Sequence, residues 1–288
     1  MSLAEDMVDD QARWLAQRQG KLREQQQLIV ARALASLTEE LKRVNPGSWT
    51  EASRRNTMAM ILDLVNRLRG SQTVALRRAL ALVSQRAWRN TARWITELDK
   101  LYAGAARPLA WDSLGHWQAG WGPYDRTRLR VYRRSMRRYG AAAVADIEVA
   151  VGQRVLLGRS WVEARDEVMS IVRDKVGDRQ WMVDRILRTE SAAAYNSTAL
   201  QAMHAENEEI PDDPLSKKLV ATWDARTARD SKLLHGQMRP LGAKFLDPLT
   251  QREYMTPPNR PNDREQVIGW RESWPDSDEF DRDTRRPG

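Results

Sequence analysis

Apolar residues recur at intervals of three and four through the first two-thirds of the chain, and this spacing is that of packed helices. One such stripe consists of Val30, Leu34, Leu37, Leu41 and Val44, and another consists of Met58, Ile61, Leu62, Val65 and Leu68. Each stripe forms one apolar helix face that needs a packing partner. The pattern therefore predicts a series of helices that pack against one another and extend to about residue 206.

Glycines and capping signals set the predicted helix ends. Residues 48–51 and 160–163 both read Ser-x-x-Glu, the spacing of a capping box, in which two side chains satisfy free backbone N–H groups at a helix start. Gly70 and Gly140 are predicted to end helices. Residues 103–123 contain four glycines, two prolines and three tryptophans. They predict a long loop whose tryptophans either pack beneath the helices or bind a partner.

A basic helix is predicted at residues 125–139, which contain seven arginines against one aspartate. Helical spacing places on one face Arg126, Arg130, Arg133, Arg134 and Arg137, with apolar residues on the other. Such a face binds phosphates, binds an acidic protein surface, or is merely solvated, and the sequence leaves all three open. No base-reading motif accompanies the arginines, so sequence-specific recognition of DNA is not expected.

The residue pattern changes after residue 214. Residues 219–223 and 266–270 are rich in strand-forming side chains and predict two short strands. With the loops between them, they predict a compact α+β cap that begins at about residue 215. Residues 275–288 hold eight charges and two prolines, which is typical of a disordered tail.

These patterns predict a mainly α fold, with an elongated helical N-terminal part and a small α+β C-terminal cap. The predicted domains are a helical region with the tryptophan-rich loop at 1–123, helices followed by the cap at 124–274, and the tail at 275–288.

The net charge and the residue composition limit the partners that this chain can bind and the chemical sites that it can form. The net charge is +8, which suits nucleic acid, an acidic protein face or an anionic membrane surface. The absence of cysteine excludes disulfides, thiolate metal sites and cysteine nucleophiles. No run of 18 apolar residues occurs, and acidic residues stand at the N-terminus where a signal peptide needs basic ones. We therefore expect neither a membrane span nor a secretion signal.

Four motifs occur in order in the second half of the chain. The first is Leu-Gly-Arg-Ser-Trp-Val-Glu-Ala-Arg at 157–165, and the second is Ile-Leu-Arg-Thr-Glu at 186–190, followed by Ala193 and Asn196. The third is Trp-Asp-Ala-Arg-Thr at 223–227, followed by Leu-His-Gly at 234–236. The fourth is Pro-Pro-Asn-Arg-Pro-Asn-Asp-Arg-Glu at 257–265, followed by Val267 and Trp270. In this order, over about residues 147–272, the chain resembles the phage head morphogenesis family, the Mu F-like minor head proteins.

The resemblance implies a structural protein of the virion. Members of this family are minor components of the phage head near the portal vertex, where they act in head assembly or in handling DNA. The implied partners are the portal protein, the major capsid protein, or both, with packaged double-stranded DNA as a further candidate and no membrane. The implied location is the phage head, and the host cytoplasm during assembly.

The chain departs from the family pattern at two positions. Many members have Cys or His where this chain has Ser231, and Cys where it has Asp263. Such residues pair or bind a metal, whereas Ser and Asp make a zinc site improbable. We therefore expect no metal and no other cofactor, and a cap held by hydrogen bonds and packing.

The motifs supply the candidate structural residues, which are Arg188, Thr189, Glu190, Asn196, Asp224, Arg226, Thr227, Gly236, Pro257, Pro258 and Arg264. Charges at Arg188 and Glu190 point to different sides of a helix, so one of them is expected to face the cap and the other solvent. We expect Glu190 to accept a bond from Arg226 and Asn196 to bond loop backbone.

The remaining motif residues are predicted to shape the backbone of the cap. Asp224 and Thr227 suit a tight turn, because their side chains bond nearby backbone N–H groups. Gly236 is expected to adopt a positive φ. Pro257-Pro258 is expected to stiffen an extended approach to the last strand.

An enzymatic function is not expected. An acid–base site would have to be assembled from His235, Asp224, Glu190 and Arg226. The sequence shows no nucleophile motif, phosphate loop or metal-ligand spacing, so no catalytic residue is predicted. The main alternative to the virion role is a non-specific DNA-binding helical protein that organises packaged DNA. A third class, a toxin or modifying enzyme joined to this type of domain, is disfavoured because few residues follow the cap.

Overall fold

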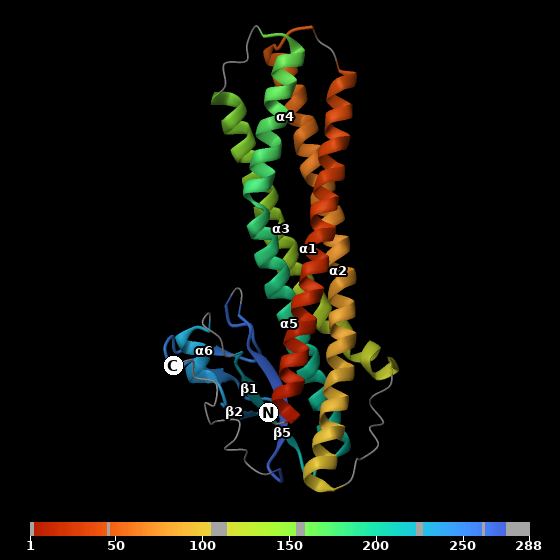
Figure 1. Ribbon diagram of the computed structural model, residues 1–288, viewed down its shortest axis with the longest axis vertical. Coiled ribbons are helices and arrows are strands. Elements are labelled where there is room, and N and C mark those ends of the chain that lie inside the picture. Colours follow the sequence, from red (N-terminus) through yellow and green to blue (C-terminus); the bar gives the residue numbers. More distant parts are fainter. Residues whose placement is uncertain are drawn as a thin grey trace. The chain divides into compact units, whose positions relative to one another are not determined.

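The computed structural model describes residues 3–44, 47–104, 114–153, 159–222, 227–260 and 263–274. Helices account for 73% of the chain, which confirms the mainly helical fold with a long N-terminal helical part. The long helices are α1 (Leu3–Arg43), α2 (Glu51–Ala103), α3 (Leu114–Gln153), α4 (Trp161–Asp178) and α5 (Gln180–Glu209) (Figure 1). In the described part of the chain, no helix combines the length and apolarity needed to cross a membrane.

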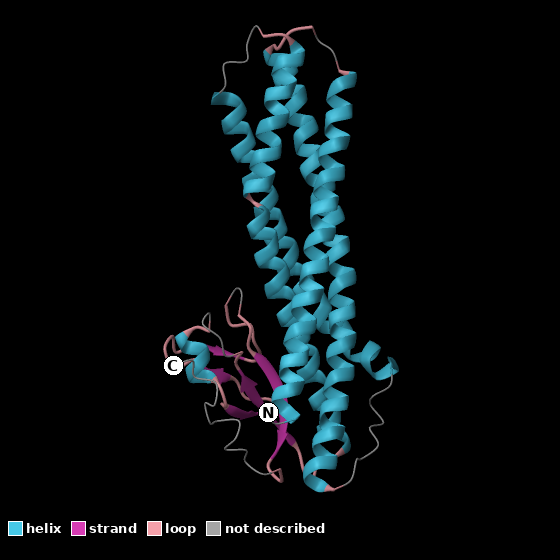
Figure 2. Cartoon of the chain, in the orientation of Figure 1, coloured by secondary structure: helices cyan, strands magenta, loops and turns pink. Residues whose placement is uncertain are grey.

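The strands lie in the C-terminal region, as predicted (Figure 2). The elements there are β1 (Leu215–Val220), α6 (Arg229–Leu234), β2 (Met238–Pro240), β3 (Phe245–Leu246), β4 (Glu253–Tyr254) and β5 (Gln266–Arg271). An antiparallel sheet has the order β2-β1-β5, and β3 pairs separately with β4. The predicted strand at 266–270 is thus confirmed, and the one predicted at 219–223 begins four residues earlier than expected.

Two predicted helix ends are wrong, and a third predicted interruption is wrong in part. Helix α2 continues through Gly70 and α3 through Gly140. A single glycine costs a helix only about 1 kcal/mol relative to alanine, which burial of the flanking turns outweighs. At Gly140 a Cβ atom would lie 3.4 Å from Val65 Cγ1, so the glycine permits close packing there. The loop predicted at 103–123 is helical from Leu114 onward.

The chain divides into two compact units. Unit 1 comprises residues 1–19, 79–128 and 188–288, and unit 2 comprises residues 20–78 and 129–187. Helices α1, α2, α3 and α5 contribute residues to both units. Each unit therefore combines residues from either side of position 123, where the sequence suggested a boundary.

Unit 2 is built around an apolar core. Its most buried members include Leu37, Leu41, Ile61, Ile147, Ala164, Val168 and Val172. The stripes read from the sequence at 30–44 and 58–68 supply much of this core. Burying such side chains contributes about 1.5–3 kcal/mol each, so this unit follows directly from the apolar spacing.

Two loops close one end of the unit 2 core. Trp49 and Trp161 stack with their ring centroids 5.8 Å apart, and Trp161 Nε1 donates to the Leu41 carbonyl oxygen at 3.3 Å. The backbone N–H of Trp49 donates to the Arg159 carbonyl oxygen at 3.0 Å. The aromatic pair thus fills the space where the chain reverses direction, and backbone bonds fix the two loops to each other.

The capping box at the start of α4 is confirmed. Ser160 Oγ accepts from the Glu163 N–H, while the Ser160 N–H donates to Glu163 Oε2 at 3.3 Å. At the start of α2 the reciprocal pair is instead Thr50 and Ser53, with Ser53 N donating to Thr50 Oγ1 at 3.1 Å. The box predicted at 48–51 is therefore displaced by two residues.

Candidate functional site

The candidate site lies in unit 1, where polar side chains connect α5 to the strands. Asn196 is buried on α5, and its side-chain amide forms hydrogen bonds in both directions. Asn196 Nδ2 donates to the Glu265 carbonyl oxygen at 3.0 Å, and the Val267 N–H donates to Asn196 Oδ1 at 2.9 Å. The prediction that Asn196 bonds loop backbone is confirmed. The second and fourth sequence motifs are joined by this one side chain.

A second asparagine repeats this arrangement at the other end of the sheet. Asn207 Nδ2 donates to the Leu215 carbonyl oxygen at 2.9 Å, and the Leu215 N–H donates to Asn207 Oδ1 at 2.6 Å. Asn196 and Asn207 are eleven residues apart (207 − 196 = 11), or about three helical turns, so they share one face of α5. We call Asn196, Asn207 and their backbone partners the polar seam.

Arg271, at the end of β5, forms a buried charge cluster beside the polar seam. Its Nε lies 3.2 Å from Asp99 Oδ1, and its other nitrogens bond Glu206 Oε1 and the carbonyl oxygen of Asp213. The side chains of Arg271, Asp99 and Glu206 are at most 1% exposed. Sequence reasoning missed this cluster because Asp99 and Arg271 are 172 residues apart and no local motif marks either.

Aromatic rings cover the Arg271 cluster. Trp274 lies with its ring centroid 5.7 Å from the Arg271 guanidinium carbon, and Trp270 meets Trp274 edge-on with 5.4 Å between centroids. Lys218 Nζ lies 5.2 Å from the centroid of the Trp270 ring. Cation–π contacts gain strength when water is excluded, so the tryptophans lower the energy of burying these cations.

Two buried carboxyl groups precede β5. Burial, followed by the neighbouring charge of Asp263, raises the pKa of Glu265 to about 7. Burial also raises the pKa of Asp263, which accepts from the Asn259 N–H at 3.2 Å. Tyr254 donates its hydroxyl to Glu265 Oε2 at 3.3 Å. Glu265 therefore exchanges its proton near neutral pH.

Ser231 and Asp263, where the sequence departs from the family pattern, lie close together. Asp263 belongs to this carboxyl pair, and Ser231 hydrogen-bonds Glu265. Arg260 Nη2 donates to Ser231 Oγ at 2.7 Å, and the same guanidinium forms an ion pair with Asp230. Hydrogen bonds thus hold this part of the cap, as expected for Ser231 and Asp263. Among the residues that the structure describes, no group of three or more His, Asp or Glu side chains is arranged to hold a metal ion.

Several motif residues adopt their predicted conformations. Glu190 is buried while Arg188 is exposed, as expected for neighbouring positions on one helix. Gly236 has a φ of 80°, and its N–H donates to the Leu219 carbonyl oxygen at 2.8 Å. Thr189 is half-buried on α5.

Other motif residues differ from expectation or lie outside the described ranges. The Thr227 hydroxyl donates to the Thr222 carbonyl oxygen. The Pro257–Pro258 peptide bond is cis. The Arg264 carbonyl oxygen accepts from Thr222 Oγ1 at 3.2 Å. Asp224 and Arg226 lie outside the described residues, so the predicted Glu190–Arg226 bond stays a prediction.

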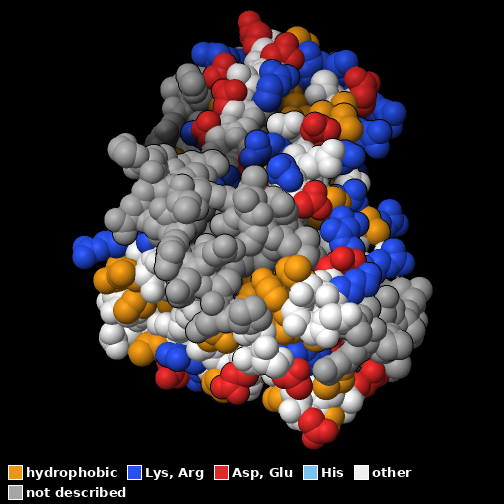
Figure 3. All heavy atoms as spheres, turned by 60° about the horizontal axis from the view of Figure 1, so that its bottom comes forward, with side chains coloured by type: hydrophobic (Ala, Val, Ile, Leu, Met, Phe, Trp, Pro, Cys, Tyr) orange, Lys and Arg blue, Asp and Glu red, His pale blue; other side chains and the backbone are white. Residues whose placement is uncertain are grey.

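The basic segment at 125–139 lies within α3 and is amphipathic. Arg133, Arg134 and Arg137 are exposed, whereas Met136 and Tyr139 are buried. The side chains of Arg126 and Arg130 lie outside the described ones. On the face shown in Figure 3, basic and acidic side chains are interspersed over the coloured surface. No large field of one sign is visible in the coloured part of that face.

His235 has a structural contact. The Ala221 N–H donates to His235 Nδ1 at 3.1 Å, which fixes the ring beside the end of β1. Of its three supposed partners in an acid–base site, Asp224 and Arg226 lie outside the described residues. Only Glu190 is described, as a buried side chain on α5.

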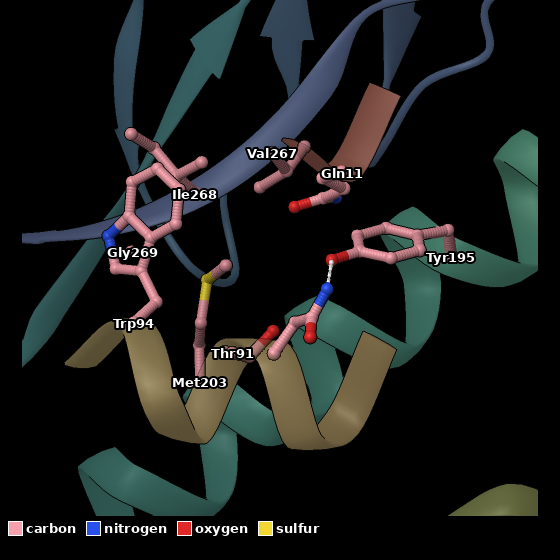
Figure 4. A pocket seen from close by; sticks show the side chains of 9 residues that line it. Gln11, Thr91, Trp94, Tyr195, Met203, Val267, Ile268 and Gly269 are labelled. Atoms are coloured by element: carbon pink, nitrogen blue, oxygen red, sulfur yellow. Dashed lines mark hydrogen bonds between the residues drawn. The ribbon is translucent and has the colours of Figure 1, made fainter. Parts of the chain in front are cut away.

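Two cavities flank the polar seam. The smaller, of about 10 Å³, is lined by side chains from α1, α2, α5 and β5 (Figure 4). There Asn90 Nδ2 donates to the Tyr195 hydroxyl at 3.3 Å, and burial raises the pKa of Tyr195. The larger, of about 170 Å³, reaches Asn196, Asp263 and Glu265.

A comparison with known proteins finds no matching family model, curated protein or solved structure.

Proposed function

We propose that this chain is a structural minor head protein of a tailed bacteriophage, which acts in head assembly and/or DNA packaging and ejection near the portal vertex. The proposal originates in the resemblance of four ordered motifs to the Mu F-like family. Its partners would be the portal protein, the major capsid protein, or both.

Hydrogen bonds between the motifs support the proposal beyond the resemblance in sequence. Asn196 of the second motif bonds the carbonyl oxygen of Glu265, the last residue of the fourth motif, and the N–H of Val267 in β5. Thr222, directly before the third motif, bonds the carbonyl oxygen of Arg264 in the fourth. Motif residues that were separate in sequence therefore stabilise one small domain, which is the role expected of a docking unit in a structural protein.

Mass spectrometry of purified heads, with quantitation against the major capsid protein, tests the proposal. We expect the chain at low copy number in every particle. Its presence only in immature heads would make it an assembly factor. Its absence from both mature and immature heads would contradict the virion role.

A second function, non-specific DNA binding, is favoured by the exposed arginines of α3. Binding to duplex DNA should weaken with salt with a slope of about −0.9 per phosphate contacted. Changing Arg130, Arg133 and Arg137 to Glu should abolish it. The matched control changes Arg55, Arg77 and Arg78, which are exposed on α2, to Glu. Equal loss in both variants, or no binding by the wild type at low salt, would contradict DNA binding by this face.

A further inference from the structure

The larger cavity of unit 1 has one apolar wall and one polar wall. Its volume is about 170 Å³, and a cavity of about 150 Å³ accommodates a benzene-sized molecule. Leu15 and Ala16 of α1 and Ala192 of α5 supply apolar surface. Glu265, directly before β5, and Gln266, its first residue, supply polar surface.

The polar wall has an excess of acceptor atoms. Gln266 is 4% exposed, and its Oε1 has no hydrogen-bond partner within the described chain. Glu265 is 2% exposed, and its Oε1 likewise lacks a donor among the described residues. Buried polar atoms in folded proteins are nearly always hydrogen-bonded. Both residues line the cavity, so a ligand there that donates hydrogen bonds would satisfy these two acceptors.

The charges around the cavity favour a cationic donor. Asp263 and Glu265 both line it, and burial raises the pKa of each by more than the nearby charge of Arg260 lowers it. Arg260 attracts both carboxyl groups, but its guanidinium already bonds Asp230 and Ser231. Arg264 lines the same cavity and has another interaction.

The other groups that face the carboxyl pair are neutral. Tyr254 of β4 donates to Glu265, and Ser231 of α6 hydrogen-bonds it. Gln19 of α1 and Tyr195 of α5 complete the polar lining from the helices. None of these four side chains carries a charge at neutral pH, so a cationic ligand would meet two carboxyl groups, Asp263 and Glu265, and one lining guanidinium, that of Arg264.

We propose that this cavity binds an alkylguanidinium group, such as that of an arginine side chain. A guanidinium carries five N–H donors in a rigid plane, and it is more weakly hydrated than an ammonium group. Its methylene stem can lie along Leu15 and Ala16 while its donors reach Glu265 and Gln266. The inference does not depend on the virion role.

The probe is n-butylguanidinium, titrated into the full chain and followed by calorimetry. We expect saturable binding in the millimolar range. Glu265→Gln should weaken it at least tenfold, because the change removes the charge and keeps the shape. Ala16→Phe should also weaken it at least tenfold, by placing a phenyl ring at the α1 edge of the cavity, where Ala16 is exposed. Ala35→Phe is the matched control, since Ala35 is exposed on the same helix outside the cavity, and it should bind like the wild type.

Proton linkage gives a second readout. A bound cation favours ionised Glu265, so binding below pH 7 must release a proton. The affinity should fall as the pH drops below 7, approaching about tenfold per pH unit for one linked proton. This dependence should flatten in Glu265→Gln.

Three results would overturn the proposal. The first is that the wild type does not bind n-butylguanidinium. The second is that it binds n-butylammonium as tightly as n-butylguanidinium. The third is that Ala16→Phe and Ala35→Phe bind n-butylguanidinium with the same affinity. Circular dichroism of each variant verifies that it is folded, and the alanine pair decides the question if Glu265→Gln unfolds. Absence of the chain from phage heads would remove the virion role and leave this result unaffected.

Discussion

The internal contacts that stabilise unit 1 differ in kind from those that stabilise unit 2. The core of unit 2 consists of aliphatic residues and two stacked tryptophans, such as Leu41 and Trp161. Unit 1 also buries apolar residues, but its sheet is joined to α5 by asparagine amides and by the charges of Arg271 and Glu206. Apolar burial has no preferred direction, whereas each hydrogen bond requires a partner at a defined distance and angle.

This difference predicts that the core of unit 2 tolerates amino-acid substitutions better than the polar contacts of unit 1 do. A core such as that of unit 2 accepts hydrophobic changes that conserve volume at a cost below about 1.5 kcal/mol. In the polar seam and the Arg271 cluster, removal of one partner leaves another buried group uncompensated, which costs more than the bond itself contributes. Five substitution or pH experiments test the contrast.

Arg271→Met is expected to have the largest effect. It leaves Asp99 and Glu206 buried without their cation, which costs about 3–5 kcal/mol. Urea unfolding followed by circular dichroism measures the loss. Arg252→Met, at an exposed position, is the matched control and should change stability by less than about 0.5 kcal/mol.

Hydrogen exchange localises the effect of Arg271→Met. Amides of β1 and β5 should exchange faster in the variant, while those of α4 keep their protection. Equal loss of protection in α4 would show that the two units do not unfold separately, and the contrast between them would fail.

The sequence predicted unit 2 better than unit 1 for a physical reason. The stripe that includes Leu37 and Leu41 is visible as a spacing, because apolar periodicity is a local property of a helix. The partnership of Arg271 with Asp99 has no local signal, since long-range pairing leaves no spacing to read. Of the polar seam, only Asn196 was found, through its motif, and Asn207 was missed.

Leu41→Ala should have the next largest effect, in unit 2. Loss of the buried side chain removes its transfer free energy and leaves a cavity, which costs about 2–5 kcal/mol. Leu41→Met, with a similar volume, should cost less than about 1.5 kcal/mol. Urea midpoints of the two variants measure the difference. Comparable losses in both would mean that the unit 2 core depends on exact shape, contrary to the contrast drawn above.

Asn196→Ala should destabilise unit 1 by about 2 kcal/mol. The change leaves the Glu265 carbonyl oxygen and the Val267 N–H buried without their partners, and unsatisfied buried groups cost about 1–3 kcal/mol. Asn196→Asp is the informative companion, because it keeps the acceptor for Val267 and loses the donor to Glu265. Unfolding midpoints that place Asn196→Asp at wild-type stability would contradict the role of the donor.

The carboxyl pair makes the stability of unit 1 depend on pH. The pKa of Glu265 rises from 4.5 to about 7 on folding, so the folded chain binds this proton more tightly than the unfolded chain. Its contribution is therefore full below pH 4.5 and is lost as the pH rises through 7, with a slope of at most about 1.4 kcal/mol per pH unit. Urea midpoints between pH 5 and 8 should show this decline, and Glu265→Gln should flatten it. An unchanged slope in the variant would assign the titration to another group.

Ser160→Ala should have the smallest effect, because the capping box of α4 lies at an exposed helix start in unit 2. The change removes the acceptor of the Glu163 N–H, and losing such a cap costs about 1 kcal/mol. Ser160→Asn should retain most of the stability, since asparagine is an equally favoured cap residue. Unfolding midpoints, together with exchange of the amides in the first turn of α4, measure both variants. A loss above about 3 kcal/mol would show that this polar contact matters as much as a core leucine, and that unit 2 also depends on directed bonds.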